Sequence, residues 1–253
     1  MRLAGKIAVV TGAGAGLGRA VALRFASEGA IVVAADTNET HGTSLVRQLN
    51  DLGCEGIFVR TDISDECEVR RLFDTTLTRY LRVDILYNNA AVLSYEHDSQ
   101  VHELSVETWD HIMGINLRGA FLCSKYAIPS MLRHGGGSII HLSSPTGLYG
   151  CAPNLTAYSA SKAGLLGLSR AMAAAHARNQ IRVNSIIPGT MDTPMNSHLF
   201  SDNSLRERYR AAIPLGRLGT PKDIEGLAVF LASDESAYCT GGVYMCDGGL
   251  TAI

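Results

Sequence analysis

An apolar run leads directly into a glycine-rich turn in the stretch Ile7-Ala8-Val9-Val10-Thr11-Gly12-Ala13-Gly14-Ala15-Gly16-Leu17-Gly18-Arg19. Residues 7–10 predict a buried β-strand, and residues 18–28 predict the helix that follows. The glycines do not fit Gly-x-Gly-x-x-Gly but do fit Thr-Gly-x-x-x-Gly-x-Gly. Such glycines let the backbone approach a pyrophosphate, which then meets the N–H groups at the start of the helix. The stretch therefore predicts a nucleotide-binding strand–turn–helix.

The rest of the chain repeats this alternation of short apolar runs and helix-length segments. Strands are expected at residues 7–10, 30–35, 56–60, 83–87, 138–142, 181–187 and 242–246. Helices are expected, among others, at residues 18–28, 66–80, 109–133, 157–178 and 221–232. This pattern is typical of βαβ units that build a parallel sheet covered by helices on both faces. We predict one doubly wound α/β domain over residues 1–253, with a sheet of about seven strands.

Composition excludes several classes of function. The chain has 253 residues, 46% hydrophobic and 18% charged, and a net charge of -2, so neither nucleic acid nor an anionic membrane is an expected partner. Its eight histidines and six cysteines show no metal-ligand spacing, so no metal is expected. The sequence has neither a secretory leader nor an apolar run long enough to span a membrane, and we expect a soluble cytoplasmic protein with free thiols.

The second predicted strand is followed by Asp36, which lies 24 residues after Gly12. An acidic residue at about this distance accepts hydrogen bonds from the adenosine ribose of NAD and would repel the 2′-phosphate of NADP. Position 37 is threonine, Ala15 adds no charge, and Arg19 is expected to be structural. The alternative role for Asp36 is that of a turn or helix-capping residue. We expect NAD as the cofactor.

Tyr158 and Lys162 stand four residues apart in Tyr158-Ser159-Ala160-Ser161-Lys162, fourteen residues after Ser144. Residues at this spacing share one face of a helix. The ammonium is expected to lower the pKa of the phenol from its usual value of about 10 and to make it a usable acid and base. The alternative is a surface lysine beside a half-buried tyrosine.

Taken together, these residues resemble the short-chain dehydrogenase/reductase family in its compact branch, which has a Rossmann-type fold. The resemblance runs from Thr11 to the turn at Asp247-Gly248-Gly249. It includes Asn88-Asn89-Ala90, Asn184 and Pro188-Gly189. The resemblance implies a catalytic tetrad of Asn116, Ser144, Tyr158 and Lys162. It implies cofactor contacts from Gly12, Ala15, Gly16, Leu17, Gly18, Asp36, Asp62, Ile63, Asn89, Ala91, Tyr158, Lys162, Pro188, Gly189, Met191 and Thr193.

Two departures from the family pattern concern the site. Ala91 replaces the usual glycine, which adds a methyl group near the cofactor. The interval from Ser144 to Tyr158 is one residue longer than is commonest, which leaves Ser143 as an alternative. Ser144 is preferred because the family's active serine is usually the second of such a pair.

The resemblance implies that Tyr158 takes the proton of an alcohol while hydride passes to NAD. Ser144 would orient the substrate oxygen, and Asn116, through its side chain or a helix distortion, would fix a water on the proton path. Both residues also have structural alternatives: Asn116 could form hydrogen bonds with buried backbone groups, and Ser144 could cap a turn. His141 is expected to be a packed core histidine, whereas His97 and His102 are better placed to meet substrate.

Three functions are compatible with this pattern. The first is an NAD-dependent dehydrogenase of a secondary alcohol or ketone, and the second is an NADPH-dependent ketoreductase resembling 3-oxoacyl reductases. The third is a non-catalytic dinucleotide-binding sensor or scaffold, against which the intact tetrad argues. A neutral, partly apolar alcohol is the preferred substrate, although a sugar remains open.

The pocket walls are expected from residues 92–104, 145–157 and 191–214, with Tyr149, Cys151, Met195, Leu199 and Phe200 among them. The last of these segments is expected to be a mobile lid or, alternatively, an ordinary pair of surface helices. The family resemblance also implies a homotetramer.

Overall fold

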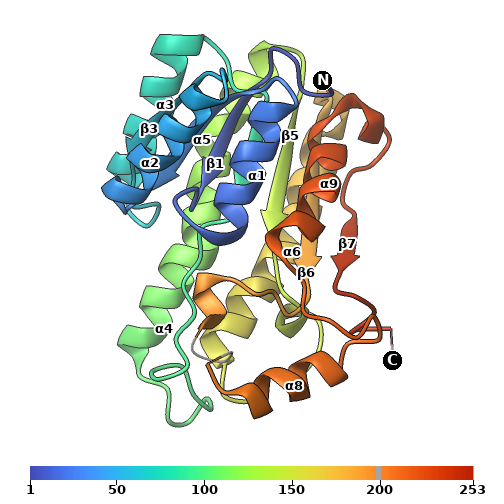
Figure 1. Ribbon diagram of the computed structural model, residues 1–253. Coiled ribbons are helices and arrows are strands. Elements are labelled where there is room, and N and C mark those ends of the chain that lie inside the picture. Colours follow the sequence, from blue (N-terminus) through green and yellow to red (C-terminus); the bar gives the residue numbers. More distant parts are fainter. Residues whose placement is uncertain (198–200, 253) are drawn as a thin grey trace.

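The sheet of this protein follows the predicted doubly wound topology (Figure 1). The structure is a computed structural model that describes residues 1–197 and 201–252. Seven parallel strands lie in the order β3-β2-β1-β4-β5-β6-β7. They are β1 (Ile7–Thr11), β2 (Ile31–Asp36), β3 (Gly56–Arg60), β4 (Ile85–Asn88), β5 (Gly137–Leu142), β6 (Ile181–Pro188) and β7 (Val243–Cys246). Each predicted strand is present, with its ends displaced by at most two residues.

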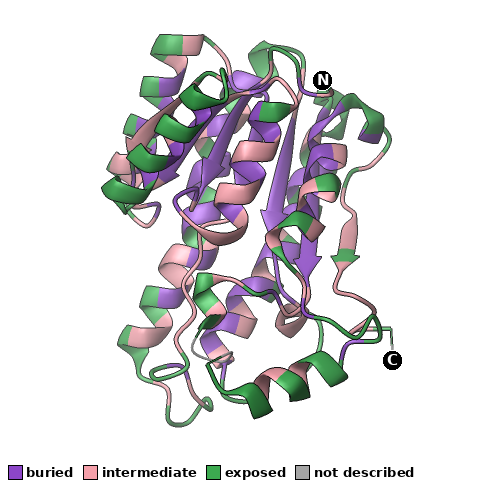
Figure 2. Ribbon diagram, viewed as in Figure 1, coloured by how far each residue is buried: buried purple, intermediate pink, exposed green. Residues whose placement is uncertain are grey.

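Helices cover both faces of the sheet, and alternate strand residues pack against each layer (Figure 2). One layer contains α1 (Gly16–Ser27), α2 (Glu39–Asp51) and α9 (Pro221–Ala232), and it packs on Val10 and Val32. The other contains α3 (Glu66–Tyr80), α5 (Ala120–Arg133) and α6 (Thr156–His176), and it packs on Val9 and Val33. This period of two explains why the strands are apolar throughout.

Two helical segments differ from the prediction. The helix expected at 109–133 is α4 (Val106–Met113), a π-helical segment (Gly114–Gly119) and α5 in succession. Helix α2 was not among the predicted helices, although Asn38 caps it by accepting a hydrogen bond from the His41 amide. Asp36 is therefore not the cap of this helix, and Asn38 takes that role.

The strand order reverses at the boundary between β1 and β4, because the chain builds β2 and β3 on one side of β1 and the remaining strands on the other. Ligands of open α/β sheets bind at such a switch point, beyond the carboxyl ends of the strands. In Figure 1, α4 and α8 (Asn203–Ala211) lie beyond this edge of the sheet. Within the described ranges, no helix combines the length and apolar character that crossing a membrane requires.

Candidate active site

The glycine-rich loop packs so closely against the end of β4 that side chains are excluded from it. A methyl group on Gly18 would lie 2.1 Å from the backbone oxygen of Gly12, and one on Gly12 would lie 2.8 Å from the Cα of Ala90. Gly12 also has a φ of +62°, which an L side chain rarely adopts. The Asn89 side-chain amide donates to the backbone oxygens of Thr11 and Gly12, each over 3.1 Å. The amide of Asn89 therefore shapes the loop.

Asp36 is fixed at the end of β2 by backbone donors on both of its carboxylate oxygens. The Gly14 amide donates to Oδ2 over 2.8 Å, and the Asn38 amide donates to Oδ1 over 2.9 Å. Arg19 points to α2, where it donates to the Gln48 side chain over 2.9 Å and to the His41 carbonyl over 3.3 Å. The expectation that Arg19 is structural agrees with these bonds.

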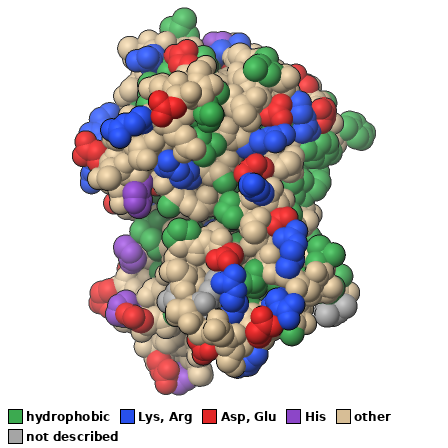
Figure 3. Space-filling model, viewed as in Figure 1, with side chains coloured by type: hydrophobic (Ala, Val, Ile, Leu, Met, Phe, Trp, Pro, Cys, Tyr) green, Lys and Arg blue, Asp and Glu red, His purple; other side chains and the backbone are tan. Residues whose placement is uncertain are grey.

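A cavity of about 910 Å³ joins the loop and the predicted catalytic residues. The face drawn in Figure 3 is indented at mid-height, with hydrophobic side chains in the indentation. The nucleotide side of the cavity is lined by Gly12, Ala15, Gly16, Leu17, Asp36, Asn89, Ala90, Ala91, Pro188, Gly189, Met191 and Thr193. The opposite side is lined by Leu93, Tyr95, Ser144, Tyr149, Cys151, Leu155, Tyr158, Lys162, Met195, Asn196 and Tyr209, together with Leu250 and Thr251.

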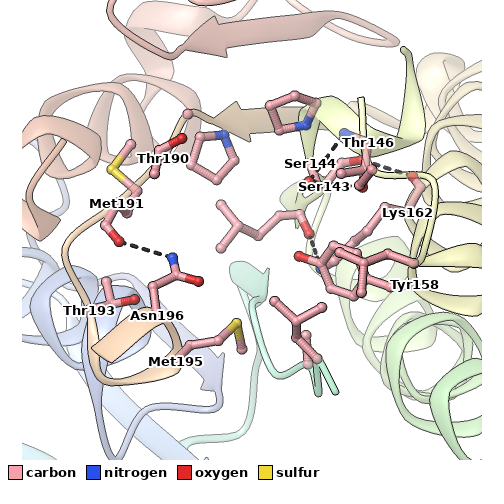
Figure 4. A pocket seen from close by; sticks show the side chains of 18 of the residues that line it. Ser143, Ser144, Thr146, Tyr158, Lys162, Thr190, Met191, Thr193, Met195 and Asn196 are labelled. Carbon is pink, nitrogen blue, oxygen red and sulfur yellow. Dashed lines mark hydrogen bonds between the residues drawn. The ribbon is translucent and has the colours of Figure 1, made fainter. Parts of the chain in front are cut away.

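The two adjacent serines differ in their partners (Figure 4). Ser143 donates to the backbone oxygen of Lys162 over 2.8 Å, which commits its hydroxyl to packing β5 against α6. Ser144 accepts from the Thr146 hydroxyl over 3.1 Å, and its side chain is close enough to the phenol of Tyr158 to lower the pKa of that phenol. This geometry favours Ser144 as the residue that would face a substrate oxygen.

The predicted effect of Lys162 on the pKa of Tyr158 is wrong for the protein alone. Burial raises the pKa of Tyr158 to about 12, and the opposing effect of the nearby Ser144 side chain offsets only part of this rise. Burial also lowers the pKa of Lys162 to about 8, because the residue is only 3% exposed. The ammonium lies over the phenol ring, 5.6 Å from its centroid, and donates to the Leu142 carbonyl over 2.8 Å. Desolvation therefore outweighs the attraction between the two groups.

Asn116 lies in the π-helical segment, where its side chain satisfies buried backbone groups. Its Oδ1 accepts from the Val92 amide over 2.8 Å, and its Nδ2 donates to the Val92 carbonyl over 2.9 Å and to Ser161 over 3.2 Å. The side chain is thus occupied, and a part in proton transfer would need the backbone of the π segment. Such segments are frequent at functional sites.

Not every predicted site residue reaches the cavity wall. Gly18, Asp62, Ile63 and Asn116 do not line it. Asp62 instead accepts from the Ser64 amide and hydroxyl. The amide of its neighbour Thr61 donates to the Asp36 carbonyl over 2.9 Å, which places Asp62 near Asp36 at the end of β2. A contact between Asp62 and adenine stays a prediction.

The three histidines considered in the sequence differ in burial and in position relative to the cavity. His141 is fully buried in β5, and burial, with a contribution from the charge of Lys162, lowers its pKa to about 3. It is a core histidine, as expected. His97 and His102 are exposed and do not line the cavity. Within the described ranges, no group of three or more potential ligands could hold a metal ion.

The described residues of segment 191–214 contribute Met191, Thr193, Pro194, Met195, Asn196, Tyr209 and Ala212 to the cavity wall. The start of the segment is tied down by a parallel bridge from Met191 to Gly219 and by an ion pair of 2.8 Å between Asp192 and Arg206. In Figure 4, Met191, Thr193, Met195 and Asn196 face Tyr158 across the cavity. Leu199 and Phe200, which were expected in the wall, lie outside the described residues. Whether this segment moves as a lid stays a prediction.

Sequence reasoning missed the wall residues Leu250 and Thr251. They follow β7, at the carboxyl edge of the sheet, and the Thr251 hydroxyl and amide donate to Asp247. No local sequence pattern could have indicated that these two residues line the cavity, because their position depends on how the segment after β7 packs in the folded protein.

The cradle fits a dinucleotide. The loop has no space for side chains at Gly12 and Gly18, and α1 begins at Gly16, so its first N–H groups are directed to the cavity. The carboxylate of Asp36 is fixed by two backbone amides in one part of the cavity wall, and Tyr158 and Lys162 line another part. Residues 188–191 and Thr193 also line the cavity.

Comparisons with known proteins agree with this geometry. A family model described as enoyl-(acyl carrier protein) reductase matches residues 12–251. The chain is 38% identical to the 3-oxoacyl-(acyl-carrier-protein) reductase of Thermotoga maritima, with 99% of both chains covered. It is 39% identical to the cis-4-hydroxycyclohexanecarboxylate dehydrogenase of Sinomonas cyclohexanicum, with 98% of this chain and 97% of that one covered.

A solved structure shares the fold over almost the whole chain. It is a Beutenbergia cavernae protein described provisionally as an NAD(P)-dependent gluconate 5-dehydrogenase, with NADP bound at low occupancy. The TM-score is 0.93 and the identity 36%, with 99% of this chain and 98% of that chain covered. The chain therefore belongs to the short-chain dehydrogenase/reductase family, whose members are oxidoreductases that bind a nicotinamide dinucleotide.

Proposed function

We propose that this protein is an NAD-dependent dehydrogenase that interconverts a secondary alcohol and a ketone. The observation that carries the proposal is that Ser144, the buried phenol of Tyr158 and Lys162 line the same cavity as Asp36 and the glycine loop. A proton-transfer group and a nucleotide cradle share one space, which is what hydride transfer to a bound dinucleotide requires.

Different residues of the chain have different roles in the proposed oxidation of an alcohol. Ser144 holds the substrate oxygen, and Tyr158, as phenolate, takes the hydroxyl proton. NAD, when bound, accepts the hydride that leaves the carbinol carbon and contributes a positive charge, so that the products are a ketone and NADH. Because burial raises the pKa of Tyr158 to about 12 despite the opposing effect of Ser144, the phenolate depends on the positive charges gathered around it. Lys162 supplies one of these charges.

Asp36 supports NAD rather than NADP as the cofactor. Both of its oxygens already accept backbone hydrogen bonds, so the carboxylate stays fixed in the cavity wall. A 2′-phosphate would meet this negative charge, and Arg19 is engaged with α2. Repulsion between unit charges a few ångströms apart amounts to about 4 kcal/mol at an intermediate dielectric.

The second candidate is an NADPH-dependent ketoreductase. It is favoured by the similarity to a 3-oxoacyl-(acyl-carrier-protein) reductase and by the solved structure with NADP. It would use the same Ser144 and Tyr158, with the phenol giving its proton to the carbonyl oxygen. The nucleotide preference separates the two candidates, whereas a non-catalytic sensor would transfer no hydride with either nucleotide.

The cavity wall supports an uncharged substrate with an apolar body. Asp36 and Lys162 are the only charged side chains among the described residues that line it. Besides uncharged polar residues such as Asn196, the substrate side includes Leu93, Tyr95, Tyr149, Leu155 and Met195. A carboxylate or phosphate would lose its hydration there without gaining an arginine or lysine of its own. Cyclohexanol should therefore be a better substrate than 4-hydroxycyclohexanecarboxylate.

We also propose a homotetramer. Support comes from large hydrophobic side chains on the outer surfaces of α5 and β7, where Phe121 and Leu132 are more than two-fifths exposed and Met245 nearly so. Association with further copies of the chain would cover such large exposed apolar side chains. Analytical ultracentrifugation tests this directly, and a single monomeric species at micromolar concentration would contradict it.

The enzymatic proposal is tested by screening cyclic and linear secondary alcohols, sugars and steroids with NAD and with NADP. We expect NADH formation from neutral alcohols, with a kcat/KM for NAD at least about tenfold above that for NADP. A tenfold preference for NADP would favour the ketoreductase instead. An absence of hydride transfer in both directions with both nucleotides would contradict any enzymatic role.

A further inference from the structure

A buried carboxylate lies behind the predicted catalytic tyrosine. Asp98 belongs to the loop between β4 and α4 and is only 3% exposed. Its Oδ1 accepts from the Ala157 amide over 3.0 Å, and its Oδ2 accepts from the amide of Tyr158 itself over 2.9 Å. A carboxylate that is buried this deeply is costly unless its hydrogen bonds repay the lost hydration. Backbone amides of α6 supply these hydrogen bonds to both oxygens of Asp98.

The first turn of α6 needs such an acceptor. The first N–H groups of a helix have no partner within the helix, and Leu155, which precedes α6, has an apolar side chain that cannot accept from them. Asp98, which lies in a distant part of the chain, accepts hydrogen bonds from these amides instead. Its negative charge is also attracted to the positive end of the helix dipole. Next to it, the Thr156 hydroxyl donates to the Ser99 carbonyl over 2.6 Å. The loop and the helix are thereby clamped together.

The same loop is fixed at its other end to the π-helical segment. The Val92 backbone exchanges two hydrogen bonds with the side chain of Asn116. Between these two anchors, Leu93 and Tyr95 line the cavity. Asp98 thus connects the substrate wall to the helix that carries Tyr158 and Lys162.

We propose that Asp98 is a positioning residue that holds the first turn of α6 so that the Tyr158 phenol stays against Ser144. The inference rests on the proposed function, because it assigns Asp98 a part in that reaction through Tyr158. Tyr158 is the third residue of α6, so a frayed first turn would displace its backbone directly. A displacement of about 1 Å in an active site can cost a hundredfold in rate.

The test compares Asp98→Ala and Asp98→Asn with the loss of a helix cap elsewhere. Asp65 is the local N-cap of α3, and its exposed carboxylate accepts through Oδ1 from the Cys67 amide over 2.7 Å and from the Glu68 amide over 3.4 Å. Asp65→Ala therefore removes a helix cap far from Tyr158. The measurements are kcat at saturating nucleotide and substrate, the Kd for NADH, and the melting temperature.

We expect Asp98→Ala to lower kcat by at least about tenfold while the Kd for NADH stays within about twofold. Asp98→Asn keeps one acceptor oxygen and should give an intermediate kcat, and it carries the test if the alanine variant fails to fold. Asp65→Ala should lose thermal stability but keep its kcat within about twofold.

The failure of the positioning role can be distinguished from the failure of the proposed function. An active wild type whose Asp98 variants keep kcat within about twofold, and lose only stability as Asp65→Ala does, would overturn the positioning role. A wild type that transfers no hydride in either direction with either nucleotide would overturn the proposed function and this inference with it.

Discussion

The hydroxyl of Ser143 donates to the backbone oxygen of Lys162, whereas its neighbour Ser144 lies in the cavity wall with Tyr158 and lowers the pKa of that phenol. Adjacent residues of the same type thus have different tasks. Ser143→Ala should remove a buried hydrogen bond and lower the free energy of unfolding by about 1 kcal/mol, with kcat changed by less than about threefold. Ser144→Ala should lower kcat by about tenfold or more, with little loss of stability. Steady-state kinetics and denaturant titrations of both variants check this, and the opposite assignment of effects would make Ser143 the active serine.

The buried lysine predicts a stability that depends on pH. The pKa of Lys162 is about 8 in the folded protein, against an ordinary value of 10.5. Below pH 8 both states hold the proton and the cost of burying the charge is constant. Between pH 8 and 10.5 the unfolded chain binds more protons than the folded one, so the free energy of unfolding should rise with pH.

Lys162→Met isolates this effect. The difference in unfolding free energy between wild type and variant should shift in favour of wild type across pH 8 to 10.5, by up to about 3 kcal/mol. Tyr158 has the opposite sign, because its raised pKa makes the folded protein lose stability from pH 10 to 12, but it is present in both proteins and cancels. A difference that does not change with pH in this window would show that Lys162 is not desolvated.

The nucleotide preference should depend on the charge of Asp36. Asp36→Asn removes the repulsion of a 2′-phosphate, so the ratio of kcat/KM for NADP to that for NAD should rise about tenfold or more. Arg19→Gln is the control, because the guanidinium is bonded to α2 and should leave this ratio unchanged. If Arg19→Gln instead lowered the kcat/KM for NADP tenfold, Arg19 would be a phosphate ligand.

Two glycines should respond in opposite ways to a methyl group. In Gly18→Ala the new Cβ would lie 2.1 Å from the backbone oxygen of Gly12, so the loop must shift, and we expect the Kd for NADH to rise about tenfold or more. Gly226 is an exposed residue of α9 with no described atom within 4 Å of such a methyl group. Gly226→Ala should raise stability by about 0.5–1 kcal/mol without changing NADH binding. Calorimetry and NADH fluorescence distinguish the two, and equal affinities would argue against the cradle.

The sequence predicted the sheet well, because each strand is a short apolar run between glycine or polar residues. It predicted less about the helices. The π segment around Asn116 keeps apolar residues at near-helical spacing, so nothing in the pattern marks the change in hydrogen bonding. Helix α2 begins at the polar residues after Asn38, and it was not predicted although this cap is local.

The electrostatics of the site could not be predicted, since spacing says that Tyr158 and Lys162 are close but not how deeply they are buried. Burial decides the pKa of both. The role of Asp98 as a helix cap was not predicted, for a different reason. It caps α6 from 59 residues upstream, whereas sequence patterns find only caps that adjoin their helix.

The central claim is that Tyr158 serves a hydride transfer from a secondary alcohol to NAD. Its most direct test is to supply cyclohexanol deuterated at the carbinol carbon and to measure deuterium in the NADH formed by wild type and by Tyr158→Phe. We predict one deuterium per NADH with wild type, and a rate at least about a hundredfold lower in the variant, whose NADH affinity stays unchanged. NADH without deuterium, or a variant as fast as wild type, would contradict the account.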